Sequence, residues 1–533
     1  MDNRVFLAII LSIGVLILSQ YIYMKYFSPT PPTHNQTLTD IPKENKNEHI
    51  EASQGFIAKP LAIDTKEQTY SIKTNYYNAQ ITNLGVRFKA FKLLNYSQDL
   101  KKKDPVDLVS AKKDGLPLEI YLAQSPQLAL LPFESNNPTD NIITSNHTLS
   151  FKGKAGPIEI EKKYTFKNNS YFIDLDVKIK NLGNETLKDR LLVRGVFGPF
   201  SKGNGYVFKG PFYYTNHLNE VNLKDSLVEY AGPLKFLGYM DVYFLVSIIP
   251  LENSTFRSTF RNISEEIKEF ILWTEEITIA PNSEKGFHFK LYMGPKKSEE
   301  LAKEFPLLSK ALYFGMFDFV AKPLLYLLKF LNNFVHNYGI AIIIVTLLIR
   351  ILFYPLNHVS YKSMKKMQEL QPIFQRLKEK YKDDPQTLQK EIMQLYRTHK
   401  INPFSGCLPI LIQIPVFIAF YKVLLMAIEL RHAPFFLWIN DLSSPERLYL
   451  GTFEIPWLGG IPVLTILMGI SMYIQQKLTP TSMDPTQEKI MLILPIFFTI
   501  LFINFPSGLV LYWLMNNILS ILQQLITLKL SKK

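Results

Sequence analysis

Apolar and polar residues alternate along much of the first half of the chain. In Ile173–Lys180 every second side chain is apolar and the others are charged, which predicts a strand with one buried face. Phe287–Met293 repeats this pattern. Many such segments, separated by turn residues, predict a large antiparallel β-sandwich domain over residues 56–300.

Other parts of the chain are apolar over lengths that approach the ~20 residues a helix needs to cross a bilayer. These segments lie near Val5–Met24, Tyr338–Leu356, Phe404–Leu425, Trp457–Gln476, Lys489–Asn504 and Gly508–Leu528. They predict a multi-pass α-helical membrane protein with six spans. The last five spans would form a helical core within residues 338–533.

The first apolar segment predicts a signal anchor at residues 1–25 that is not cleaved. Ser19–Lys25 lacks a cleavage site of the Ala-x-Ala type and carries aromatic residues suited to the membrane interface. Residues 26–55 are rich in Pro, Thr, Asn and Lys and have little to bury. They predict a flexible linker between the anchor and the β domain.

Residues 301–337 are amphipathic and aromatic. Leu324 and Leu328 recur at helical spacing, while Lys322 and Lys329 fall among the apolar residues. A helix of this kind suits the membrane interface better than the bilayer interior. We therefore expect interfacial helices before the second span.

Residues 357–402 also show helical spacing, but with a strongly basic surface. Apolar residues recur every three to four positions in Met364–Leu377 and again in Leu388–Leu395, with Asp383-Asp-Pro385 between them. The pattern predicts a hairpin of two antiparallel helices. Its basic face would contact anionic lipid or ribosomal RNA, or would simply be solvated.

The location of the positive charge predicts the orientation of the spans. The chain has 533 residues and a formal net charge of +13, and much of the excess lies beside the apolar segments. The loop 357–402 carries Lys362, Lys365, Lys366, Arg376, Lys378, Lys380, Lys382, Lys390, Arg397 and Lys400. The positive-inside rule therefore places this loop in the cytoplasm, together with the basic C-terminal tail. The β domain is then external, as in a Gram-negative inner-membrane protein with a periplasmic domain, and the single cysteine, Cys407, excludes an intrachain disulfide there.

Arg350 is a candidate functional residue because it lies within the apolar segment Ala341–Tyr354, which contains no acidic residue. A cation at the centre of a bilayer costs at least ~2.5 kcal/mol, so water or an anionic group should meet it. The alternative is that Arg350 extends its long side chain to the lipid headgroups on the cytoplasmic side. The helix alone does not distinguish these two interpretations.

The chemistry of the predicted spans argues against several classes of protein. They contain neutral polar residues, among them Thr346, Gln413, Asn516, Asn517, Gln523 and Gln524, and also Lys422, but no carboxylate near mid-membrane. Proton- or sodium-coupled transporters generally need such a carboxylate, so a water-filled polar groove fits better. No catalytic, metal-binding or nucleotide-binding motif is recognisable, so we expect no enzyme activity, no metal and no cofactor.

Two motifs resemble those of a known family. Asn402–Tyr421 resembles the signature of the YidC membrane protein insertases, and Phe505–Trp513 with the following Asn and Gln pairs resembles their last span. Thr346–Pro355 and Glu429–Pro434 also look like this family. The resemblance is close from about Gly339 to Gln524 and looser across the β domain, where Gram-negative members carry a β-supersandwich.

The resemblance implies a five-helix core around a hydrophilic groove that opens to the cytoplasm and the lipid and is closed outside. Arg350 matches the groove arginine, which receives polar or acidic parts of an incoming chain. Thr346, Gln413, Tyr512 and Trp513 match groove or substrate-contact positions. Lys422 departs from the family pattern, which has an uncharged residue there. The implied partners are nascent membrane proteins, the Sec translocon and its accessory subunits, the ribosome through the basic cytoplasmic loops, and membrane lipids.

Two other classes remain open from the sequence. A solute transporter would move small molecules without a protein substrate, and an envelope protein would bind glycan through the β domain. The aromatic cluster Phe208–Tyr214 could stack on a sugar, although aromatic residues at strand spacing usually belong to a core. We expect an insertase or chaperone that moves hydrophobic segments into the inner membrane, alone or with the Sec translocon.

Overall fold

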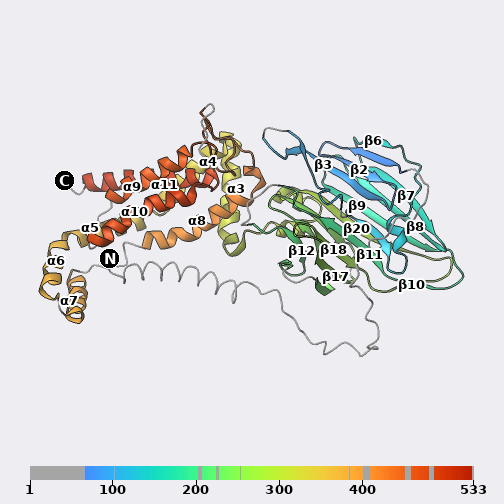
Figure 1. The fold of residues 1–533 in the computed structure, drawn as a ribbon, viewed down its shortest axis with the longest axis horizontal. Coiled ribbons are helices and arrows are strands. Elements are labelled where there is room, and N and C mark those ends of the chain that lie inside the picture. The colour runs from blue at the N-terminus through green and yellow to red at the C-terminus, as the bar shows by residue number, and fades with distance from the viewer. Residues whose placement is uncertain are drawn as a thin grey trace. The chain divides into compact units, whose positions relative to one another are not determined.

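The computed structural model describes residues 67–100, 103–113, 115–201, 207–223, 227–252, 254–382, 384–399, 408–450, 458–478 and 485–530. The chain divides into a β unit that ends at Leu312 and a helical unit that begins at Tyr313 (Figure 1). The expected anchor at 1–25 and linker at 26–55 lie outside the described residues.

Twenty strands are described in the β unit. Their bounds are Thr69–Lys73 (β1), Tyr77–Thr82 (β2), Arg87–Ser97 (β3), Pro105–Asp107 (β4), Glu119–Leu122 (β5), Asp140–Ile142 (β6), His147–Ala155 (β7), Ile158–Phe166 (β8), Phe172–Asn181 (β9), Leu187–Asp189 (β10), Leu191–Phe197 (β11), Gly210–Tyr214 (β12), Leu218–Glu220 (β13), Leu227–Pro233 (β14), Phe236–Met240 (β15), Phe244–Pro250 (β16), Thr255–Asn262 (β17), Lys268–Trp273 (β18), Ile277–Ile279 (β19) and Glu284–Pro295 (β20).

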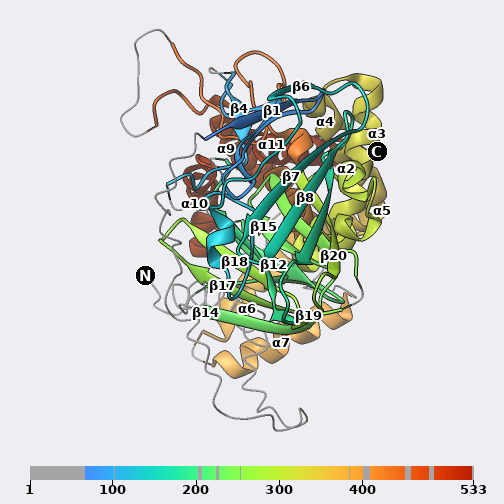
Figure 2. The same ribbon diagram turned by 90° about the vertical axis from the view of Figure 1, so that its right-hand side faces the viewer.

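The strands form four sheets that are antiparallel except where β1 pairs with β6. The largest has eight strands in the order β13-β12-β15-β16-β20-β9-β8-β7, and its long strands β7 and β8 run beside each other in Figure 2. Two five-stranded sheets have the orders β4-β3-β2-β1-β6 and β14-β17-β18-β11-β5, and β10 pairs with β19. The described β unit is therefore rich in antiparallel sheet.

The two strands predicted from alternation are confirmed. Ile173–Lys180 lies in β9 and Phe287–Met293 lies in β20, and these two strands pair with each other. In β9 the side chains of Leu175, Val177 and Ile179 are buried while the residues between them are more exposed. The aromatic cluster belongs mainly to the core, because Phe212 and Tyr214 are buried and Tyr213 stacks on Tyr230.

A chain of buried charges crosses the five-stranded sheet of β14, β17, β18, β11 and β5. Arg194 in β11 donates to Glu119 of β5 at 2.6 Å and to Glu269 of β18 at 2.5 Å. Arg87 donates to the other oxygen of Glu119 at 2.9 Å, and Arg261 donates to the other oxygen of Glu269. Each buried carboxylate therefore accepts from two arginines, which compensate its negative charge.

Lys162 of β8 lies fully buried near this chain of charges. Its Nζ donates to the carbonyl oxygens of Gly85 at 2.7 Å and Ile120 at 3.0 Å, and it lies 4.6 Å from the centre of the Phe133 ring. Burial, and secondly the charge of Arg87, lower the pKa of Lys162 to about 7. Lys162 therefore links the eight-stranded sheet to segments of both five-stranded sheets.

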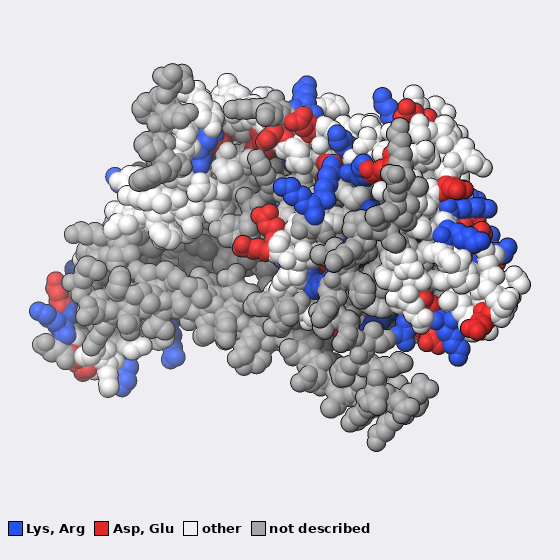
Figure 3. Space-filling view, turned by 45° about the vertical axis from the view of Figure 1, so that its right-hand side comes forward, with Lys and Arg blue, Asp and Glu red and all other residues white. Residues whose placement is uncertain are grey.

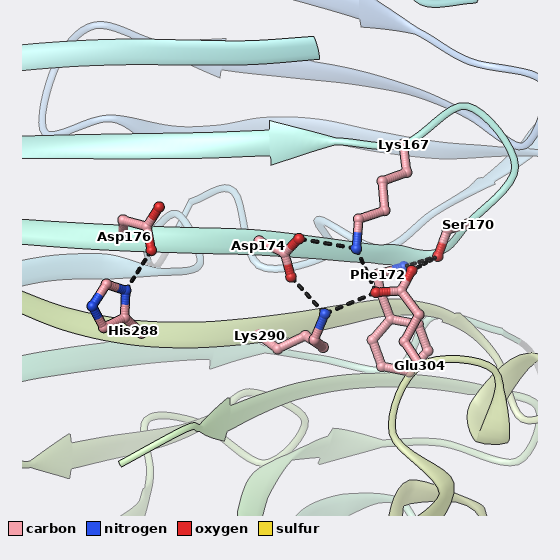
Figure 4. Close-up of polar contacts among 8 residues, drawn as sticks. All are labelled: Lys167, Ser170, Phe172, Asp174, Asp176, His288, Lys290 and Glu304. Atoms are coloured by element: carbon pink, nitrogen blue, oxygen red, sulfur yellow. Dashed lines mark hydrogen bonds and ion pairs between the residues drawn. The ribbon is translucent and has the colours of Figure 1, made fainter. Parts of the chain in front are cut away.

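The segment that leaves the last strand is held against the large sheet by Glu304. This residue follows the helix Ser298–Ala302 (α2), and its carboxylate accepts from Ser170 at 2.6 Å, Lys167 at 2.5 Å and Lys290 at 2.8 Å (Figure 4). Burial alone would raise the pKa of Glu304, but these hydrogen bonds outweigh it and lower that pKa to about 2. The path of the chain out of the β unit is thus fixed by an ionised carboxylate.

The helical unit contains the following described helices: Gly315–Phe317 (η4), Asp318–Val335 (α3), Tyr338–Leu352 (α4), Tyr354–Glu369 (α5), Gln371–Lys380 (α6), Pro385–Thr398 (α7), Leu408–Met426 (α8), Ile428–Leu430 (η6), Val463–Leu478 (α9), Pro485–Phe502 (α10) and Ser507–Leu530 (α11). The segment η3, Pro306–Ala311, precedes them in the β unit. Helix α11 packs against α9 and α4, and α3 packs against α4 and α8. On the face drawn in Figure 3, Lys, Arg, Asp and Glu are interspersed over the β unit.

The predicted span Tyr338–Leu356 does not form one straight helix. Helix α4 ends at Leu352, and α5 begins at Tyr354 with a bend of 62° between the two. Pro355 explains the break, because proline has no N–H to donate to the preceding turn and disfavours helical geometry in Tyr354. The segment expected as one span is therefore divided between two helices.

The described part of the basic segment 357–402 contains residues of three helices, rather than the expected two. The apolar pattern of Met364–Leu377 is divided between α5 and α6 at Leu370, because Pro372 occupies the first turn of α6. The predicted break at Asp383-Asp-Pro385 is confirmed, since Asp384 accepts from the backbone N–H of Gln386 and of Thr387 and caps α7. Helices α6 and α7 contact each other.

Length and apolar composition alone identify few spans among the described helices. Ser507–Ile526 in α11 is long and apolar enough to cross a membrane, and the bent pair α4 and α5 passes the same test as a unit. Gln413–Met426 and Leu492–Phe502 are shorter apolar helices. The expected six spans are therefore not established by the described helices.

Candidate functional site

The candidate site begins with the placement of Arg350 in the last turn of α4. Asn337 caps the start of this helix, where its side-chain oxygen accepts from the N–H of Gly339 and of Ile340. A cation in the last turn is favoured by the partial negative charge of the helix C-terminus. The helix therefore compensates part of the cost of placing Arg350 among apolar residues.

The guanidinium of Arg350 is directed toward α11. Its Nη2 donates to Oγ of Ser520 at 2.5 Å, while its Nε is buried and has no hydrogen-bond partner among the described residues. Ser520 is 1% exposed, and its hydroxyl donates a hydrogen bond to the carbonyl oxygen of Asn516 at 2.7 Å. Arg350 thus retains an unused donor inside the helical unit.

Ser520 belongs to a polar stripe on α11. The stripe, Asn516, Asn517, Ser520, Gln523 and Gln524, follows the three- and four-residue spacing of one helix face. Asn517 donates to Oγ of Ser471 in α9 at 2.9 Å, and both residues are buried. The polar stripe therefore contacts polar groups of α4 and of α9 between otherwise apolar helices.

Three of the other predicted site residues, Thr346, Gln413 and Tyr512, form hydrogen bonds within the helical unit. Thr346 is 1% exposed, and its hydroxyl donates to the carbonyl of Ile342 in its own helix at 2.7 Å. Gln413 of α8 donates to the Tyr512 hydroxyl at 3.5 Å, and the Tyr512 ring lies 4.7 Å from that of Phe420. The structure thus pairs Gln413 with Tyr512, while the Thr346 hydroxyl is satisfied within α4.

Trp513 lies in an aromatic cluster of α8, α10 and α11. Its ring centre lies 4.9 Å from that of Phe417, 5.1 Å from Phe502 and 5.8 Å from Phe498. These rings come from three different helices, so Trp513 joins the apolar side of α11 rather than its polar stripe. Lys422 is half-buried one turn before the end of α8.

Sequence reasoning missed Ser520 and Ser471, the two hydroxyl groups that organise the polar contacts. The spacing of Asn516, Asn517, Gln523 and Gln524 contained the signal for Ser520, because a residue at position 520 completes the same helix face. Ser471 carried no comparable signal, since it is a single small polar residue in an apolar helix. Among the described residues, no group of three or more His, Cys, Asp or Glu could hold a metal ion.

An apolar helical unit with a buried polar stripe and an inward-directed arginine, joined to a β-sheet domain, defines a class of membrane protein with a large domain outside the bilayer. Comparison with known families agrees with this class. Residues 330–533 match the family described as 60Kd inner membrane protein, and residues 69–327 match the YidC periplasmic domain. The chain belongs to the YidC family of membrane protein insertases.

Relatives resemble the chain over nearly its full length. It is 37% identical to a membrane protein insertase YidC of Syntrophobacter fumaroxidans, covering 98% of this chain and 99% of that protein. It is 39% identical to a membrane protein insertase YidC of Syntrophus aciditrophicus, with coverage of 98% and 99%. A solved structure of an active YidC insertase aligns over 87% of this chain and 93% of that chain, with 23% identity and a TM-score of 0.38.

Proposed function

We propose that this chain inserts hydrophobic segments of nascent membrane proteins into the inner membrane through a polar, positively charged groove beside Arg350. The observation that carries the proposal is the inward-directed guanidinium, which contacts Ser520 and keeps its Nε without a partner among the described residues. Membership of the YidC insertase family supports the substrate class.

The proposed mechanism lowers a transfer cost and requires no covalent step. A polar segment that crosses bare lipid loses its hydrogen bonds to water, which costs several kcal/mol. The donors of Arg350 and the amides of the α11 polar stripe would replace part of that hydration. Acidic groups would gain most, because Arg350 adds a charge-assisted hydrogen bond.

The apolar surface beside the polar stripe suits the hydrophobic part of a substrate. Exposed residues of α10, including Ile493, Ile496, Phe497 and Ile500, would face lipid or an entering helix. Within this proposal Thr346, Gln413, Tyr512 and Trp513 line or support the groove. Six spans, an external β-supersandwich at 56–300, interfacial helices at 301–337 and a cytoplasmic hairpin at 357–402 belong to the same proposal.

The proposal also includes partners of the insertion step. The basic residues of α5, α6 and α7 would contact the ribosome or anionic lipid, since most of their Lys and Arg side chains are exposed. The Sec translocon and its accessory subunits would share part of the substrates.

The test compares Arg350→Ala, Arg350→Lys and a control, Arg376→Ala, in reconstituted vesicles without ribosomes. Arg376 is exposed on α6, outside the proposed groove, so its replacement controls for the loss of one positive charge. With a substrate whose translocated segment is acidic, Arg350→Ala should lower the insertion yield about tenfold, which corresponds to roughly 1.4 kcal/mol. Arg350→Lys should retain part of the activity, and a neutral segment should depend less on position 350. Equal yields for wild type and Arg350→Ala with the acidic segment would refute the groove role.

A further inference from the structure

The loop that follows α8 is anchored to the ends of three helices. Oδ1 of Asp441 accepts from the N–H of His432 at 3.1 Å, and the Asp441 carbonyl accepts from the Ser507 hydroxyl at the start of α11. Oε1 of Glu446 accepts from the N–H of Leu464 at 2.9 Å, at the start of α9. Arg447 donates to the carbonyl of Ile503, just after α10. The loop is therefore held in a defined shape.

At the tip of this anchored loop, two large apolar side chains are exposed. Leu437 is 85% exposed, more than any other large hydrophobic side chain in the described part of the chain, and Phe436 is 53% exposed. Leu437 also adopts a left-handed backbone with φ 58°, a conformation that is unfavourable for an L-residue with a large side chain. Hydrogen bonds between the backbones of Phe435, Phe436 and Ile439 close the turn.

The tip lies at the end of the helical unit where α3 ends and α4 begins. The carbonyl of Phe435 accepts from Nδ2 of Asn337 at 3.2 Å. The Phe435 ring packs against Gly339, where an added Cβ would lie 2.0 Å from the ring. The last turns of α3 expose Phe330 and Phe334 to 58% and 68%. Exposed aromatic groups of α3 and of the loop therefore occur at the same end of the unit.

We propose that Phe436 and Leu437 form an apolar wedge that inserts into the headgroup and upper acyl region of the lipid leaflet at this end. The inference rests on the membrane location in the proposed function, but not on the groove. Residues Pro434–Trp438 carry no charge, and aromatic side chains favour the membrane–water interface. The exposed aromatic side chains of α3 lie at the same end of the helical unit and extend this apolar surface, so lipid is the partner that it suits best. The wedge would hold the start of α4 at a fixed depth in the bilayer.

The depth of Leu437 can be measured directly in the full chain. Cys407 is replaced by serine, and a spin label is attached to a cysteine at position 437 in vesicles of phosphatidylethanolamine and phosphatidylglycerol. A label at exposed Leu522 of α11 serves as the lipid reference, and one at exposed Lys285 of β20 serves as the aqueous reference. Oxygen concentrates in lipid, whereas a nickel chelate stays in water. The spin label at position 437 should therefore collide several-fold more with oxygen than with the chelate, as the label at position 522 does.

Two results would overturn the wedge. Accessibility to nickel like that of position 285 would place Leu437 in water, and low accessibility to both reagents would show that protein covers it, for example a second copy. If insertion activity persists in either case, the proposed function stands without the wedge. If the label at position 522 also reads as aqueous, the membrane location itself fails.

A second pair of variants separates lipid contact from loop folding. Leu437→Asn removes the apolar side chain but suits a left-handed backbone, so the loop should fold normally. His432→Asn is the matched control, because His432 lies in the same loop with φ 59°. With a spin label at position 436, only Leu437→Asn should shift accessibility from oxygen toward nickel. No shift in Leu437→Asn, or an equal shift in both variants, would contradict lipid insertion by Leu437.

Discussion

Arg350 and Ser520 join α4 to α11 through a hydrogen bond of 2.5 Å between Nη2 and Oγ. Ser520 is 170 residues away in the sequence, and its hydroxyl also donates to Asn516 one turn earlier in α11. The guanidinium is thus directed toward α11, in the interior of the helical unit, instead of extending along α4 to its end. This orientation favours an internal role for Arg350 over contact with lipid headgroups.

We expect Ser520→Ala to destabilise the helical unit by about 1–3 kcal/mol, because it removes the acceptor of a partly buried guanidinium. The unfolding midpoint of the full chain in detergent should fall. Ser520→Thr keeps the hydroxyl and should recover most of the loss. A midpoint unchanged in Ser520→Ala would show that the contact contributes little.

The contact between Gly339 and Phe435 predicts a pair of compensating mutations. Gly339→Ala should destabilise the chain by about 1–3 kcal/mol, because the new methyl group would overlap the Phe435 ring. In the double variant with Phe435→Ala, the overlap disappears, and the two effects should be strongly non-additive. Thermal unfolding of the two single variants and the double variant gives the coupling, and additive losses would refute the contact.

Glu304 predicts a loss of stability in acid. Its pKa is lowered from 4.5 to about 2 in the folded chain, so the stability it contributes is present above pH 4.5 and is lost as the pH falls toward 2. Glu304→Gln should flatten this part of the pH profile of unfolding. Glu284→Gln is the control, since Glu284 forms an exposed pair with Lys178 at 3.6 Å and should have almost no effect. Identical acid profiles for wild type and Glu304→Gln would contradict the prediction.

Lys162 predicts a second rise of stability with pH, in the neutral to alkaline range. The folded chain holds its pKa at about 7, below the ordinary value of 10.5, so the unfolded chain binds more protons between these values. Stability should therefore rise from pH 7 to pH 9, by about 1–2 kcal/mol. In Lys162→Met this rise should disappear, because methionine does not titrate. The carbonyls of Gly85 and Ile120 lose their donor in this variant, but that loss does not depend on pH. Denaturant unfolding at pH 7 and pH 9 measures the difference in the free energy of unfolding. If Lys162→Met retains the rise, another titratable group causes it.

The sequence predicted those parts of the fold that depend on local periodicity. The alternation in Ile173–Lys180 reflects a strand with one buried face, and it could be recognised without knowing the partner strand. The order of strands in the sheets could not be predicted, because β20 pairs with β9 across more than a hundred residues. Local patterns contain no information about such pairings.

The candidate site was predictable to a similar extent. Arg350 was conspicuous as a lone charge in an apolar segment, whereas Ser520 became significant only when α11 was placed beside α4. The break after Leu352 was missed because the apolar run of α4 continues into Phe353, although Pro355 was visible in the sequence. A proline signals a helix break through its missing N–H, which a hydropathy average does not detect.

The bend after Leu352 has a mechanical consequence. The N–H of Phe353 still donates to the carbonyl of Ile349, and the N–H of Asn357 donates to the carbonyl of Phe353 at 3.0 Å. Backbone hydrogen bonds therefore hold the bend between α4 and α5, the elbow, on both sides. Arg350 lies one turn before that elbow. A displacement of α5 would therefore be transmitted through the backbone to the last turn of α4, which carries Arg350.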